Sequence, residues 1–284
     1  MHSAESFVPN DICLGDRNIA REHNATGIKP STVAIITGPN MGGKSSYLRT
    51  VALTVIMAQI GSFVPATAYN LYGLFDAVHV RMGAADDLAS GRSTFMVEME
   101  EVSAILGCAK RSSLVILDEV GRGTSTHDGT ALAYATLQTL IRQQVPTLFV
   151  THFPLLAAVA HEYPSMVANF NMAFLEESDE NADESTSLLF LYKLTAGIAS
   201  KSFGLNVARL AGLPSQLVQS AALHAQRLEG RTMARRRDAS RTLFAALCSA
   251  LGLDSDGENQ FDVSVTSTLM TLLRPLLKQA HAFL

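Results

Sequence analysis

The residues best suited to chemistry begin with a glycine-rich loop, GPNMGGKS at 38–45, which follows an apolar run and precedes a helical pattern. The loop fits the spacing G-x-x-x-x-G-K-[ST], in which glycines let backbone N–H groups turn inward around phosphate oxygens. In this spacing Lys44 would reach the β- and γ-phosphates, and the Ser45 hydroxyl would bind Mg²⁺. A helix beginning near Lys44 would add its positive dipole end. We therefore expect a nucleotide-phosphate site with Mg²⁺ here rather than a plain glycine turn.

Two adjacent carboxylates, Asp118 and Glu119, end the apolar run LVILDE at 114–119. An aspartate at the end of a buried strand lies where a magnesium shell needs an oxygen ligand, so Asp118 is the expected metal-side acid. Glu119 would point toward the γ-phosphate, where it can orient and deprotonate a water molecule. The pair favours hydrolysis over phosphoryl transfer to a second substrate. The alternative is that both acids cap the turn before GRG at 121–123.

Two further groups could contact a γ-phosphate. His152 ends VTH at 150–152, and ligands collect at the carboxyl ends of parallel strands, where an imidazole can hydrogen-bond phosphate. Ser93 and Thr94 precede a helical pattern within ASGRSTFMVEMEEV at 89–102. For these hydroxyls two roles stay open: a simple N-cap, or a helix end that binds the γ-phosphate held by another subunit.

An α/β fold must position these side chains. Three short apolar runs have the length and branched residues of strands buried on both faces, and helical patterns lie between them. The runs lie at 32–37, 113–118 and 146–152, and the helical patterns lie at 44–60, 94–109 and 128–143. This alternation predicts a mostly parallel sheet with helices on both faces.

After residue 165 the pattern changes. Two strands are expected at 168–177 and 185–194, joined by the acidic stretch EESDENADES, which we interpret as a solvated hairpin loop. A helix is expected at 214–229, because Pro214 suits a first helical turn.

The last part of the chain has a different composition. GRTMARRRDASR at 230–241 holds five arginines, which predicts a linker, with contact to DNA phosphate as the alternative. Two short amphipathic helices are expected within 242–284, where they would pack on a partner chain as a dimerisation segment. Their leucines are Leu243, Leu247, Leu251, Leu269, Leu272, Leu273 and Leu276.

Bulk composition narrows the class of protein. The 284 residues are 48% hydrophobic and 17% charged, which fits a globular protein with a buried core. The net charge of −4 gives no overall positive potential that would attract nucleic acid. Cys13, Cys108 and Cys248 are far apart and odd in number, which favours reduced thiols over a disulfide framework or zinc site. We expect no signal peptide and no membrane span.

The order of these motifs is that of ATP-binding-cassette ATPases, a class of P-loop NTPase. The strings TGPNMGGKSSY, GAADDLASGRSTFMVEM, LDEVGRGTSTHDG, THFP and GIASKSFGLNVARLAGLP further resemble the MutS family of DNA mismatch-repair ATPases, over about residues 5–230. Within it, GGKSSY, MAQIGSFVPA, GTSTHDG and FLYKLTAGIASKSFGLNVA most resemble the eukaryotic MutS homologue 3 group, whose members pair with MutS homologue 2 to recognise insertion–deletion loops. Residues 1–229 would then form the ATPase domain.

The resemblance assigns roles where residues match. Glu119 and His152 would act in hydrolysis, and Asp118 would complete the Mg²⁺ site with Ser45. Phe7, in SFVPND, matches an aromatic residue that stacks on adenine, and Tyr192, in FLYKL, matches a second ring beside the base; ordinary core packing is the alternative for both. Ser93 and Thr94 match the signature that completes the partner's ATP site, and 121–126 matches a stretch along the dimer interface. The ATP-binding loop residues would be Gly38, Pro39, Asn40, Met41, Gly42, Gly43, Lys44, Ser45 and Ser46.

The resemblance also implies partners and a location. It implies a heterodimer with a MutS homologue 2-like subunit, mismatched or looped duplex DNA reached through regions missing from this chain, MutL-type proteins downstream, and the nucleus. Family members carry mismatch-binding, connector, lever and clamp regions ahead of the ATPase. Because Phe7 already belongs to the nucleotide site, we expect a fragment or a truncated gene model, which puts DNA binding by this chain alone in doubt.

Two alternatives belong to other classes. A cassette ATPase of a membrane transporter or a chromosome-type clamp would carry an LSGGQ-like signature, and ASGRSTF stands in its place. A nonenzymatic assembly module would have lost hydrolysis, and intact Lys44, Asp118, Glu119 and His152 disfavour that loss.

Overall fold

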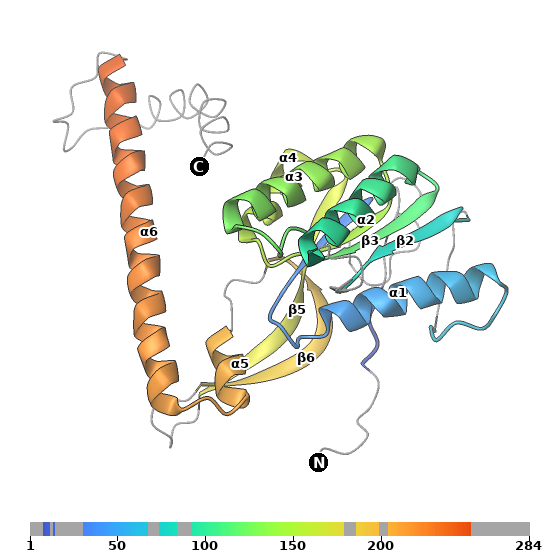
Figure 1. Cartoon of the computed structure of the whole chain (residues 1–284), viewed down its shortest axis with the longest axis horizontal. Coiled ribbons are helices and arrows are strands. Elements are labelled where there is room, and N and C mark those ends of the chain that lie inside the picture. The colour runs from blue at the N-terminus through green and yellow to red at the C-terminus, as the bar shows by residue number, and fades with distance from the viewer. Residues whose placement is uncertain are drawn as a thin grey trace. The chain divides into compact units, whose positions relative to one another are not determined.

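The chain divides into two compact units, Met1–Leu213 and Pro214–Leu284. The structure, a computed structural model, describes residues 8–11, 14, 31–67, 74–83, 93–178, 186–198 and 204–250. Figure 1 shows the first unit as a twisted sheet with helices on both sides.

The sheet of the first unit has six strands in the order β2-β3-β4-β1-β5-β6 within the described residues. The strands are β1 (Val33–Thr37), β2 (Ala77–Arg81), β3 (Ser113–Asp118), β4 (Thr147–Val150), β5 (Val167–Ser178) and β6 (Thr186–Ala196). All neighbouring pairs are parallel except β5 with β6, which form an antiparallel hairpin. The prediction of a mostly parallel sheet is confirmed, as is the predicted hairpin.

Helices cover both faces of this sheet (Figure 1). They are α1 (Lys44–Gln59), α2 (Thr94–Cys108), α3 (Thr126–Gln143), the 3-10 helix η3 (Pro154–Ala158), α4 (Val159–Glu162) and α5 (Gly204–Leu210). Sequence patterns predicted α1, α2 and α3; β2, η3, α4 and α5 were not predicted. None of the helices in the described residues is long and apolar enough to cross a membrane.

Alternate residues of the central strands pack into two separate cores. Val33 and Ile35 of β1 join one cluster with Val102 of α2 and Leu137 of α3, while Ile36 joins another that includes Leu48 and Val51 of α1. A strand with period-two side chains must be apolar throughout when both of its faces are covered. This explains the uninterrupted apolar runs in the sequence.

The register of the parallel strands brings their carboxyl ends to one edge. Val150, the last residue of β4, is paired with Asp118 of β3 on one side and Ile36 of β1 on the other. Beyond the strands, the N–H of Glu119 donates to the Val150 carbonyl at 3.0 Å, and the N–H of Thr151 donates to the Ile36 carbonyl at 3.1 Å. The segments after β1, β3 and β4 therefore start side by side.

The second unit is described over one helix, α6 (Ser215–Ala250). This differs from the sequence expectation, because the helix expected at 214–229 continues through the stretch 230–241 that was interpreted as a linker. Arginine and alanine are good helix formers, and the stretch contains no proline to stop the helix. The expected second amphipathic helix lies outside the described residues, so the dimerisation segment stays a prediction.

Candidate functional site

The loop between β1 and α1 has a backbone that requires glycine at specific positions. Gly38 and Gly43 have φ values of 138° and 92°. A Cβ atom at Gly38 would lie 3.2 Å from the backbone nitrogen of Met172, and one at Gly43 would lie 3.0 Å from Cδ1 of Tyr192. Glycine meets both the positive φ and the close approach. The loop is thus packed against the β5–β6 hairpin.

Lys44 places a buried positive charge inside this loop. Only 6% of the residue is exposed, and its Nζ donates hydrogen bonds to the carbonyls of Gly38 at 2.8 Å and Pro39 at 3.0 Å. Burial lowers the pKa of Lys44, and the nearby carboxylates of Glu119 and Asp118 oppose that shift. An ammonium held by two carbonyls keeps one donor for an anion.

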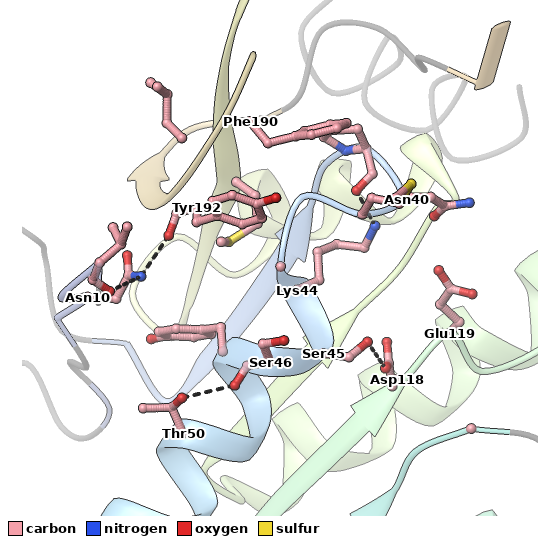
Figure 2. A pocket seen from close by; sticks show the side chains of 18 of the residues that line it. Asn10, Asn40, Lys44, Ser45, Ser46, Thr50, Asp118, Glu119, Phe190 and Tyr192 are labelled. Carbon is pink, nitrogen blue, oxygen red and sulfur yellow. Dashed lines mark hydrogen bonds between the residues drawn. The ribbon is translucent and has the colours of Figure 1, made fainter. Parts of the chain in front are cut away.

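Ser45 and Asp118 bring two oxygen ligands together from distant parts of the chain. The Ser45 hydroxyl, on the first turn of α1, donates to Oδ2 of Asp118 at 2.7 Å (Figure 2). Burial raises the pKa of Asp118, Glu119 adds to the rise, and the hydrogen bond from Ser45 opposes it. A hydroxyl and a carboxylate are the hard oxygen donors that Mg²⁺ takes beside a nucleotide. The residues present therefore fit this ion.

Glu119 turns out of the line of β3. Its φ of 56° is left-handed, which is uncommon for a residue other than glycine and recurs at active sites. Its carboxylate Oε2 accepts a hydrogen bond from Nη1 of Arg122 at 2.6 Å. Figure 2 shows the Glu119 carboxylate next to Asp118 and on the same side as Lys44.

A β-bulge places Tyr192 beside the loop. Met172 of β5 pairs with Leu194, but Phe174 pairs with Phe190, so one residue of β5 lies opposite three of β6. Tyr192 is the middle residue of this bulge and has a φ of 54°. The ring centroids of Phe190 and Tyr192 lie 6.3 Å apart. Bulges commonly re-aim side chains near functional sites.

The segment 8–11 is attached to this bulge. Asn10 uses both ends of its amide, since Nδ2 donates to the Tyr192 carbonyl at 2.8 Å and Oδ1 accepts from the Leu194 N–H at 2.6 Å. Nζ of Lys193 donates to the Pro9 carbonyl at 2.6 Å. Val8 then lines the pocket described next. Phe7, the expected adenine-stacking residue, lies outside the described residues.

These residues surround one pocket of about 1090 Å³. Loop and carboxylate groups line one part, and the rings of Phe190 and Tyr192 line another (Figure 2). The sequence-predicted residues on its wall are Pro39, Asn40, Met41, Gly43, Lys44, Ser45, Ser46, Asp118, Glu119 and Tyr192. A charged part and an aromatic part in one pocket suit a molecule with phosphates and a flat base.

Five predicted residues among those described do not line this pocket: Gly38 and Gly42 of the loop, and His152, Ser93 and Thr94. His152 is exposed as a residue, its ring centroid lies 4.2 Å from that of Phe153, and partial burial of the imidazole lowers its pKa. Ser93 is the N-cap of α2, and its hydroxyl accepts from the Met96 N–H at 3.2 Å. Thr94 is the first residue of that helix. The capping role of Ser93 is confirmed, and the contact with a partner's phosphate stays a prediction.

Sequence reasoning missed Asn10, Phe190, Arg81 and Glu98, which also line the pocket. Phe190 could have been predicted from the sequence, because it stands two residues before Tyr192 in a strand, where alternate residues share a face. No local pattern in the sequence marks Asn10, Arg81 or Glu98 as pocket residues. They take part through contacts with residues far away in the sequence.

Comparisons with known proteins show what this sequence is similar to. A model of the protein family described as MutS domain V matches residues 34–229. The chain is 47% identical over 241 residues to "DNA mismatch repair protein Msh3" of Mus musculus, covering 82% of this chain and 21% of that protein. It is 51% identical over 220 residues to the protein of that name from Dictyostelium discoideum, covering 76% and 14%. It is 48% identical over 229 residues to that from Homo sapiens, covering 78% and 20%. The chain thus spans about a fifth or less of the length of these relatives.

Proposed function

The chain belongs to the MutS family, and we propose that it is the ATP-binding and ATP-hydrolysing domain, of cassette type, of a mismatch-repair protein that senses mismatches and insertion–deletion loops. One observation carries the proposal: Lys44, the Ser45–Asp118 pair and Glu119 line the same pocket as the rings of Phe190 and Tyr192. The Msh3 relatives support the repair role, which belongs to the whole protein.

Binding would use the loop and the hairpin together. Lys44 would exchange a carbonyl of its own loop for phosphate oxygens. Its buried ammonium would then bind a negatively charged oxygen instead of a neutral carbonyl, which gives a stronger hydrogen bond. Ser45 and Asp118 would hold Mg²⁺, which neutralises phosphate charge when bound. Tyr192 and Phe190 would stack on the adenine, with Phe7 as the expected further ring.

Glu119 is the residue best placed for the chemical step. Its carboxylate would take a proton from a water molecule whose oxygen attacks the γ-phosphorus, while the bond from that phosphorus to the ADP oxygen breaks. Lys44 stabilises the charge that develops on the phosphate oxygens. A neutral His152, favoured by its lowered pKa, could donate or accept one hydrogen bond at the γ-phosphate.

The second part of the proposal concerns the partner. Two ATPase domains would associate head to tail, so that Ser93 and Thr94 of each reach the ATP of the other. The exposed position of Ser93 at the start of α2 supports this arrangement. A shared site makes ATP binding change the dimer interface, which couples nucleotide state to a DNA clamp elsewhere in the protein. The same proposal includes a MutS homologue 2-like subunit as the partner in the heterodimer, MutL-type proteins that act downstream, and a nuclear location.

ATP turnover and ATP affinity of Glu119→Gln test the enzyme part. We expect affinity within about twofold of wild type and turnover lower by about 10²-fold or more, because only the proton acceptor is lost. Undiminished turnover by Glu119→Gln would overturn the assignment. For the repair part, the full-length protein should co-purify with a MutS homologue 2-type subunit, and looped duplex should stimulate turnover more than matched duplex. Equal stimulation would contradict the loop-sensing role.

A further inference from the structure

A buried ion pair lies on the wall of the same pocket, between β2 and α2. Arg81 ends β2, Glu98 lies in α2, and their side chains are 7% and 8% exposed, with Nη2 and Oε2 4.0 Å apart. Nε of Arg81 also lies 2.8 Å from Oε2 of Glu101, an ion pair without the direction of a hydrogen bond. Arg81 further donates to the Gly83 carbonyl. Because burying charge is costly, such a pair needs a reason beyond filling space.

The second carboxylate oxygen of Glu98 contacts the turn that carries Glu119. Oε1 accepts a hydrogen bond from the backbone N–H of Gly121 at 2.5 Å. We call residues 119–123 the Glu119 turn. Glu98 therefore holds with one carboxylate both the end of β2 and this turn.

The Glu119 turn has little room to move by itself. Gly121 has a φ of 88°, and a Cβ atom there would collide with the carbonyl of Gly129 in α3. A Cβ atom at Gly123 would lie 3.0 Å from Cβ of Phe95, in the first turn of α2. The turn is thus packed between α2 and α3, so a displacement of α2 must displace it as well.

Helix α2 links this turn to Ser93. Glu98 comes five residues after Ser93, which is about 7.5 Å along a helix at its usual rise. A helix is stiff over that distance. The residue that acts on the partner's ATP in the shared-site proposal is thereby joined to the turn that acts on this chain's own ATP.

We propose that Glu98 is a positioning residue that couples the two composite ATP sites, and that Arg81 holds its carboxylate in place. Glu98 transmits a displacement of the Glu119 turn through α2 to the Ser93 end of the helix. It also transmits a displacement of the Ser93 end back to the Glu119 turn. The inference rests on the proposed shared site. A buried pair that only stabilises the fold would affect unfolding and leave communication between the sites intact.

The test measures how the state of this chain's site affects hydrolysis at the partner's site, in the full-length heterodimer with a MutS homologue 2-type subunit. In one background Glu119→Gln keeps ATP bound but unhydrolysed in this chain; in the other Lys44→Ala removes ATP binding. All turnover then comes from the partner's site, and the ratio of the two single-turnover rates is the coupling. We expect a ratio of about fivefold or more with Glu98 present, as is typical of coupled sites.

Glu98→Gln, added to both backgrounds, should bring this ratio close to one, because the amide keeps the size of the side chain but loses the charge that Arg81 holds. Glu101→Gln is the matched control, since it removes a contact of Arg81 on the same helix without touching Gly121, and it should keep the ratio. A ratio that Glu98→Gln leaves unchanged overturns the proposal, and so does a ratio of one with native Glu98.

Two further variants keep the test decisive. If the thermal unfolding midpoint shows that Glu98→Gln fails to fold, Glu98→Asp replaces it. Glu98→Asp keeps the charge but withdraws the carboxylate from Gly121, so it should also lower the ratio of the two rates. An unchanged ratio with Glu98→Asp refutes the coupling. Ser93→Ala should lower the partner-site rate by about tenfold or more, since misplaced contacts to a reacting phosphate cost that much. If Ser93→Ala has no effect, the shared site itself is wrong, whereas loss with Ser93→Ala but not with Glu98→Gln rejects only the coupling.

Discussion

Asn10 offers a direct way to ask whether the segment 8–11 shapes the proposed ATP pocket. Asn10→Ala removes the acceptor of the Leu194 N–H and the donor to the Tyr192 carbonyl, at 2.6 Å and 2.8 Å. A typical net value of about 1 kcal/mol for each hydrogen bond gives a loss of about 2 kcal/mol. Part of that loss should appear as weaker ATP binding, because Asn10 holds Tyr192, whose φ of 54° is itself unfavourable.

The size of the effect follows from how the loss divides. If all of it were used to release the bulge, ATP affinity would fall by about thirtyfold, since about 1.4 kcal/mol is tenfold; equal division between folding and binding gives about fivefold. The assay is calorimetric titration of ATP together with the thermal unfolding midpoint. Lys193→Ala is the control, because it removes the contact to the Pro9 carbonyl and leaves Asn10 in place, and we expect less than half the change.

One result would refute this reasoning: Asn10→Ala lowers the unfolding midpoint by several degrees while the dissociation constant of ATP stays the same. The segment 8–11 would then stabilise the hairpin without positioning Tyr192. An unchanged midpoint with unchanged affinity would mean that water replaces both hydrogen bonds at no cost.

Three other changes give equally specific outcomes. Gly121→Ala should lower the free energy of unfolding by more than about 2 kcal/mol, because the new methyl group meets the Gly129 carbonyl at a φ of 88°; denaturant unfolding would measure it, and a loss under about 0.5 kcal/mol would contradict the close packing. Asp118→Asn should raise the thermal midpoint of the ATP-free protein at neutral pH. Burial raises the pKa of the Asp118 carboxyl, so the ionised carboxylate is disfavoured in the folded chain relative to the unfolded chain. The free energy of unfolding of the wild type therefore falls as the pH rises from the ordinary pKa of 3.8 through the raised pKa of the folded chain. The gain should therefore shrink below that window, and a pH-independent difference would be inconsistent with this cause. Phe190→Leu should weaken ATP binding by about fivefold or more, since base–aromatic stacking contributes about 1–3 kcal/mol; titration of ATP into the variant checks this, and unchanged affinity would exclude Phe190 from the base site.

Local patterns in the sequence were sufficient for the polar part of the site. The spacing from Gly38 to Ser45 constrains a loop by itself, because φ preferences and the start of a helix act over a few residues. Asp118 was predictable because an apolar run buried on both faces must end where the sheet ends, and parallel strands end together. The same reasoning explains why the sequence predicts a sheet with helices on both faces.

Other features depend on contacts that no local pattern contains. Asn10 meets Tyr192 across 182 residues, and Glu98 meets Gly121 across 23. The bulge that turns Tyr192 into the pocket depends on the register between β5 and β6, which no local pattern in either strand specifies. The arginine-rich stretch 230–241 reads as a linker by charge, but it continues a helix because its backbone propensities agree with those of the residues before it. The sequence by itself determined which groups form the polar part of the pocket, and only the tertiary structure decided which side chains hold those groups in place, since hydrogen bonds between distant segments form only once the chain has folded.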